Sequence, residues 1–203
     1  EGVYMISRMS KRLVALVMAC TVMFSQLPSV VFATANVKTS VVEAYGNDFS
    51  NGDIQLPNEV NGVITNEDVS IEEEMLKFQS KFDGTSGWDS NKHELNFYTD
   101  YNEKIKANSK IQFDILIPTE SKEFLGVIKF KGALKDSSWN WQDGSLGDIL
   151  ASDFEDLDNG YSKVSVESTV SNEIDGIKAV VIQILSYECD YSDVIYLDNI
   201  NVV

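Results

Sequence analysis

Three tryptophans of this 203-residue sequence lie in polar surroundings, namely Trp88, Trp139 and Trp141. A tryptophan of the core usually has apolar neighbours in alternation, whereas Trp88 lies in the segment DGTSGWDS and the other two lie in SSWNWQDG. Large exposed indoles are costly to leave in water, so this setting indicates a binding surface. The alternative is that one or more of them closes an end of the fold.

Trp139 and Trp141 are two residues apart in the sequence. If Asn140 is extended, the two indoles project from the same face, about 7 Å apart. Such a pair suits neighbouring sugar rings, because one face of a pyranose packs its C–H bonds on an aromatic ring while its hydroxyls need hydrogen-bond partners. The polar side chains available near the indoles are Asn140, Gln142, Asp143, Lys129 and Lys131, although solvated surface is the simpler interpretation of each alone.

An Asp198–Asn199 pair interrupts the apolar C-terminal run. Polar groups in such a strand need partners, which are either backbone hydrogen bonds or a hard cation bound by carboxylate and carbonyl oxygens. We therefore expect Asp198 to be a calcium ligand or a hydrogen-bonded aspartate.

Catalytic motifs are sparse in this chain. The only histidine, His93, lies in a strand-like run, which favours a packed residue over a base. The sequence has no Gly-x-Ser-x-Gly elbow, no phosphate-binding loop and no Cys/His metal cluster. A glycosidase needs only two suitably spaced carboxylates, so the abundance of acidic residues leaves that alternative open.

The charge of the chain is strongly negative. Its 16 basic and 32 acidic residues give a net charge of −16. Without residues 1–35, which hold three basic residues and one acidic residue, the balance is 13 against 31, or −18. Such a field repels nucleic acids and anionic membrane surfaces, which leaves neutral ligands, cations or basic proteins as partners.

Residues 1–35 have the pattern of a secretory signal peptide. Basic residues precede an apolar run over 13–24, and small residues follow at Ala33 and Ala35. The run is shorter than a membrane-spanning helix requires, so we expect cleavage and an extracellular protein. Cleavage also removes Cys20 and leaves Cys189 as the only thiol, which excludes an intramolecular disulfide.

The rest of the sequence divides at about residue 70. Residues 36–70 are rich in Gly and Asn, which predicts a linker or an irregular segment, with a short edge strand over 60–64 as an alternative. Residues 71–203 predict a β-sandwich of the jelly-roll type, because runs rich in Val, Ile and Tyr alternate with turn signals. The expected strands are 74–82, 93–99, 110–117, 124–134, 161–166, 177–187 and 194–202, with a short helix or a loop over 145–154.

Three segments in order give the chain a resemblance to the family 27 carbohydrate-binding modules, the mannan-binding modules of bacterial endo-mannanases. They are FDILIP at 113–118, the strand and loop over 125–139, and the run over 177–202 that ends in IYLDNI. The resemblance covers residues 74–203. It implies a β-jelly roll that binds β-mannan through exposed tryptophans and carries a structural calcium ion.

The resemblance also implies roles for particular residues. Trp139 and Trp88 match the tryptophans of the family, Trp141 has no clear counterpart, and Asp198 matches the residue associated with calcium. The expected function is therefore non-catalytic binding of β-mannan, galactomannan or glucomannan, in a free-standing protein or beside a glycoside hydrolase domain. A small polysaccharide-degrading enzyme and an extracellular adhesion or assembly domain are the alternatives.

Overall fold

The computed structural model describes residues 43–50, 55–84, 92–186 and 189–203. The predicted signal peptide and Trp88 lie outside the described residues. Within them, no helix is long and apolar enough to cross a membrane.

Strands make up nearly all of the regular structure. They are β1 (Tyr45–Asn47), β2 (Glu59–Gly62), β3 (Val69–Glu72), β4 (Met75–Gln79), β5 (Lys92–Ile105), β6 (Ser109–Pro118), β7 (Ile128–Asp136), β8 (Trp141–Ile149), β9 (Glu155–Asp156), β10 (Tyr161–Val170), β11 (Ile174–Ser186) and β12 (Val194–Val202). The helices of the described residues are 3₁₀ turns, η1 (Asn66–Asp68), η2 (Thr119–Phe124) and η3 (Ala151–Asp153).

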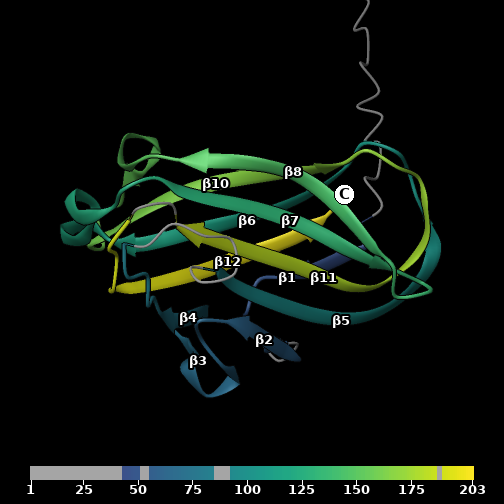
Figure 1. Ribbon diagram of the computed structural model, residues 1–203, viewed down its shortest axis with the longest axis horizontal. Coiled ribbons are helices and arrows are strands. Elements are labelled where there is room, and N and C mark those ends of the chain that lie inside the picture. The colour runs from purple at the N-terminus through teal and green to yellow at the C-terminus, as the bar shows by residue number, and fades with distance from the viewer. Residues whose placement is uncertain (1–42, 51–54, 85–91, 187–188) are drawn as a thin grey trace, which may run out of the picture. The chain divides into compact units, whose positions relative to one another are not determined.

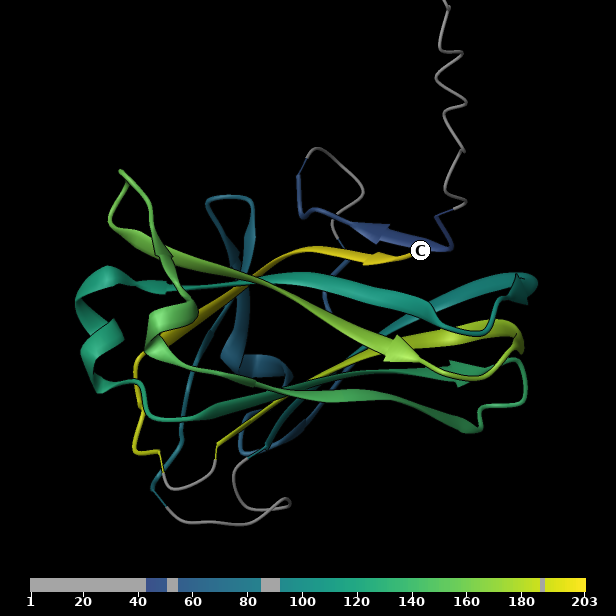
Figure 2. The same ribbon diagram turned by 90° about the horizontal axis from the view of Figure 1, so that it is seen from above.

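The strands form two layers, which Figure 1 shows from one side and Figure 2 from above. One layer, here the front sheet, has the order β2-β5-β11-β7-β8. The other, the back sheet, has the order β10-β6-β12-β4-β3, with β1 on β12 and β9 on β10. A single pair, Gly144 with Val170, joins β8 to β10, and all pairings are antiparallel. The predicted all-β antiparallel sandwich is therefore confirmed.

The front sheet is centred on β11, which pairs with β5 on one side and β7 on the other. Val180, Ile182 and Ile184 belong to the main core between the sheets, whereas Ala179 and Val181 belong to a small apolar cluster outside it. All five are fully buried. The sequence of β11 is therefore a continuous apolar run, because the strand is covered on both faces.

The described residues from 43 to 50 and from 55 to 70 contribute to the sandwich. Tyr45 lies in β1, which pairs with β12, and β2 extends the front sheet along β5. Phe49 and Ile64 are almost fully buried in the main core. The sandwich therefore includes residues upstream of 71, and the described part of the expected linker is packed.

The stretch expected to form a short helix or a loop over 145–154 is mostly strand. Residues up to Ile149 belong to β8, and only η3 is helical. Two glycines explain the close pairing with β7. A Cβ at Gly144 would lie 2.2 Å from the Gly132 carbonyl oxygen, and one at Gly147 would lie 2.4 Å from the Phe130 ring. This strand was missed in the sequence because the predicted strands are runs rich in Val, Ile and Tyr, and β8 contains glycines instead.

Candidate functional site

The hairpin between β7 and β8 is organised by Asp136. Its Oδ1 accepts hydrogen bonds from the backbone N–H groups of Ser138 and Asn140, each at 2.9 Å. Its Oδ2 accepts from Asn140 Nδ2 at 3.2 Å and from Gln142 Nε2 at 3.0 Å. Burial opposes ionisation of Asp136, but these hydrogen bonds outweigh it and lower its pKa. Asn140 and Gln142 therefore brace the turn.

Trp139 occupies the left-handed position of this turn, with a φ of 65°. The expected spacing of about 7 Å assumed an extended Asn140, whereas Trp139, the residue before it, is left-handed and lies in the turn outside β8. Glycine or asparagine usually takes this position in three-residue hairpins, so a tryptophan there is strained. The indole is 50% exposed and packs edge-to-face on Tyr98 of β5, with ring centroids 5.2 Å apart.

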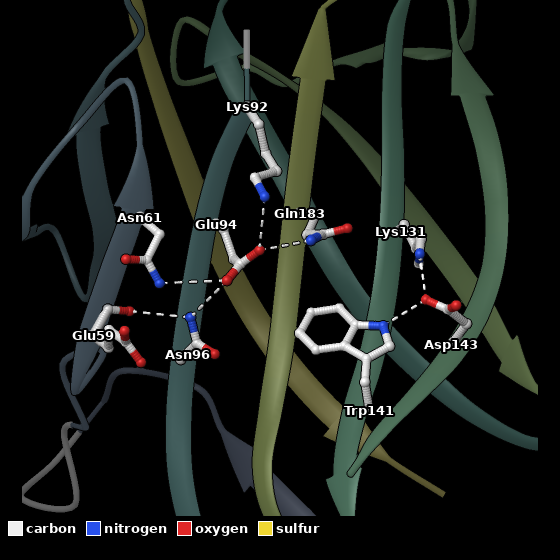
Figure 3. A network of polar contacts seen from close by, with 9 residues as sticks. All are labelled: Glu59, Asn61, Lys92, Glu94, Asn96, Lys131, Trp141, Asp143 and Gln183. Carbon is white, nitrogen blue, oxygen red and sulfur yellow. Dashed lines mark hydrogen bonds and ion pairs between the residues drawn. The ribbon is translucent and has the colours of Figure 1, made fainter. Parts of the chain in front are cut away.

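Trp141 begins β8 and lies on the outward face of the front sheet. Its Nε1 donates to Asp143 Oδ1 at 2.5 Å, and the ammonium groups of Lys131 and Lys135 lie 5.9 and 6.0 Å from its ring centroid. Figure 3 shows the indole turned toward the middle of this face, between Asp143 and β11. Lys131 also pairs with Asp143, and the hydrogen bonds from Lys131 and Trp141 lower the pKa of Asp143. The ring is thereby held in place, yet it is 38% exposed.

The strand register places small and aromatic residues together on this outward face. Across β11, Ala179 pairs with Tyr98 of β5 and Lys135 of β7, and Lys135 pairs with Trp141 of β8. The small side chains at Ala133, Ala179 and Val181 leave room above the sheet for the large rings. Tyr98, Thr99, Asp100, Trp139 and Lys178 line a surface pocket at this end of the face.

A buried polar cluster lies next to the aromatic residues. Glu94 Oε2 accepts hydrogen bonds from Gln183 Nε2 at 2.7 Å and Lys92 Nζ at 3.1 Å. Its Oε1 accepts from Asn96 Nδ2 at 3.3 Å and Asn61 Nδ2 at 3.4 Å (Figure 3). Burial opposes ionisation of Glu94, but the bonds from Gln183, Lys92 and Asn96 prevail and lower its pKa. Glu94 is thus a buried anion surrounded by donors.

Lys129 lies at the other end of β7 from the tryptophans. It lies on the outward face of β7 and pairs with Asp148 of β8. Lys129 is six positions along β7 from Lys135, the neighbour of Trp141, which corresponds to about 20 Å.

The sequence interpretation missed Tyr98, Glu94, Asn96 and Gln183. A signal was present, because Glu94, Asn96 and Tyr98 alternate with apolar residues in the run HELNFY. Alternation of this kind predicts a strand with one polar face. The partners of that face come from β11, from β2 and from the turn between β7 and β8. Sequence spacing does not reveal such cross-strand neighbours.

Asp198 lies on β12 opposite Asp114 of β6. Its oxygens accept from the backbone N–H of Asn199 at 2.8 Å and from Asn199 Nδ2 at 3.1 Å. Burial raises the pKa of Asp198, and the negative charges of Asp114 and Asp48 add to the rise. Among the described residues, no three His, Cys, Asp or Glu side chains converge to hold a metal ion. Calcium at Asp198 would therefore need backbone or amide oxygens as further ligands.

The fold is similar to that of solved carbohydrate-binding modules. TmCBM27, described as a module of specific mannan recognition, aligns with a TM-score of 0.57 and 17% identity over 79% of this chain and 96% of its own. CBM28, described as specific for non-crystalline cellulose, aligns with a TM-score of 0.52 and 14% identity over 66% of this chain and 79% of its own. No protein-family model and no curated protein matches the sequence. At these identities the similarity establishes the fold, a β-sandwich of the kind found in such modules.

Proposed function

We propose that this protein is a non-catalytic module that binds β-mannan-type polysaccharide on the outward face of its front sheet. The observation that carries the proposal is the placement of three exposed rings, Tyr98, Trp139 and Trp141, on one sheet face beside a buried polar cluster. Aromatic rings stack on the C–H faces of sugars, and polar side chains bond the hydroxyls at their edges. The sandwich fold and the similarity to TmCBM27 support the same ligand class.

Affinity electrophoresis of the full chain tests the proposal. We expect retardation in native gels that contain galactomannan or glucomannan, and less in gels with xylan or hydroxyethylcellulose. Unretarded migration in all four gels would rule the proposal out. An assay for new reducing ends tests the non-catalytic part, because their release from any of these polymers would favour the enzyme alternative.

Single substitutions test the location of the site. We expect Trp139→Ala and Trp141→Ala each to weaken binding roughly tenfold or more, because each removes a stacking surface. Phe124→Ala is the matched control, because Phe124 is an aromatic residue that is 66% exposed. It follows β6 and precedes β7, so it lies at the other end of β7 from the hairpin that holds Trp139. Equal retardation of all three variants would place the ligand elsewhere.

The remaining features of the proposal come from the sequence. We propose that the protein is exported, because residues 1–35 have the signal-peptide pattern. We also propose that it targets an associated glycoside hydrolase to its substrate, because the modules it resembles accompany such enzymes. We also propose a structural calcium ion at Asp198. Cell fractionation tests the export, and thermal unfolding with calcium or chelator tests the ion.

A further inference from the structure

Two amide oxygens of the polar cluster have no hydrogen-bond partner among the residues that the structure describes. They are Asn96 Oδ1 and Gln183 Oε1, and both are buried. Asn96 is 0% exposed and Gln183 is 3% exposed. Buried polar atoms of folded proteins are nearly always paired, so two unpaired acceptors in one cluster require an explanation.

Glu94 explains their orientation. An ionised carboxylate only accepts hydrogen bonds, so each amide must turn its nitrogen toward Glu94 and its oxygen away. Figure 3 shows this arrangement, with Gln183 Oε1 directed away from Glu94 toward the side of the sheet that holds Lys131 and Trp141. The charge of Glu94 thus fixes both amides as acceptors. The cluster offers these two acceptors to a ligand, and an N–H group of each amide is already bonded to Glu94.

We infer that Glu94, Asn96 and Gln183 select sugars that present free hydroxyl groups to the two amide oxygens. This inference rests on the proposed function and narrows its ligand. A free hydroxyl donates to an amide oxygen, whereas an O-acetyl ester has no donor and a uronate carboxylate would face another acceptor. Glu94 is a positioning residue, and Asn96 and Gln183 supply the contacts.

Calorimetric titration of the full chain tests the inference with two forms of one polymer. The probes are native, partly O-acetylated glucomannan and the same glucomannan after alkaline deacetylation. We expect the wild-type protein to bind the deacetylated form more tightly. We expect Gln183→Leu to bind the deacetylated form about tenfold more weakly and to lose the discrimination between the two forms. Glu94→Gln should have the same effect on discrimination, because an amide no longer forces the neighbouring oxygens outward.

The back sheet provides a matched control. Gln112 Nε2 donates to Glu167 Oε2 at 3.0 Å, and both residues lie in paired strands of that sheet, β6 and β10. Gln112→Leu should leave both affinities unchanged, and melting temperatures verify that each variant is folded. Equal wild-type binding of the two polymer forms would overturn the inference while the proposed function stands, as would a folded Gln183→Leu protein with wild-type affinity and discrimination. Absence of binding to either form would overturn the proposed function, and this inference with it.

Discussion

His93 makes the stability of this protein sensitive to mild acid. Its ring is fully buried, stacks on Phe82 at 4.4 Å and has Ser80 Oγ 3.3 Å from Nε2. Its Nδ1 has no partner among the described residues. Burial, aided by the charge of Lys81, lowers the pKa of His93 from 6.5 to about 3. The folded protein therefore holds a neutral imidazole at any pH above about 3.

The sign and size of the effect follow from proton linkage. Below pH 6.5 the unfolded chain binds a proton at His93 and the folded chain does not, so acid favours unfolding. Between pH 7 and pH 5.5 the free energy of unfolding should fall by about 1.3 kcal/mol. For a chain of this size that corresponds to a melting temperature lower by roughly 3 to 5 °C. The loss should continue as the pH falls toward the folded-state pKa.

Thermal and urea unfolding of wild-type protein and His93→Phe between pH 5.5 and 7 measure this effect. The sequence has one histidine, so the variant removes the only side chain whose ordinary pKa lies in this interval. We expect the variant to keep the aromatic contact with Phe82 and to show little pH dependence. Equal losses of stability in both proteins would refute a buried neutral imidazole at this position.

Three further predictions concern the hairpin, the sheet junction and the proposed ion. Trp139→Gly should be about 1 kcal/mol more stable than Trp139→Ala in urea unfolding, because only glycine is unstrained at a φ of 65°; equal stabilities would contradict the left-handed turn. Gly144→Ala should cost about 2 kcal/mol, because its Cβ would lie 2.2 Å from a backbone oxygen of Gly132; a cost below the error of the measurement would contradict the close β7–β8 approach. Calcium should raise the melting temperature of wild-type protein, with a chelator reversing it, and should not affect Asp198→Asn; an equal response of the two proteins would exclude Asp198 as a ligand.

The sequence predicted the fold better than the site. Alternating and continuous apolar runs identify β6, β11 and β12, because burial on one or both faces dictates those patterns. The strand β8 was missed, since Gly144 and Gly147 carry no strand propensity and are needed only because β7 and β10 approach closely. Short strands such as β1 depend on pairing with β12, a contact distant in the sequence.

For the site, residue type was informative and spacing was not. The polar setting of Trp139 and Trp141 correctly indicated exposed rings. Their relative geometry depends on Asp136, whose hydrogen bonds impose a turn that the i to i+2 spacing conceals. Glu94 and Gln183 are 89 residues apart and meet only through the pairing of β5 with β11. Such a pair becomes visible only when the sheet order is known.

The central claim is that polysaccharide binds to the outward face of the front sheet, at Trp139 and Trp141. Calorimetric titration with soluble galactomannan tests it most directly. We predict saturable heat for the wild-type chain and for Phe124→Ala. We predict none for the double variant Trp139→Ala/Trp141→Ala, whose cooperative thermal unfolding should verify that it is folded. Full binding by a folded double variant, or no binding by the wild-type chain, would contradict the claim.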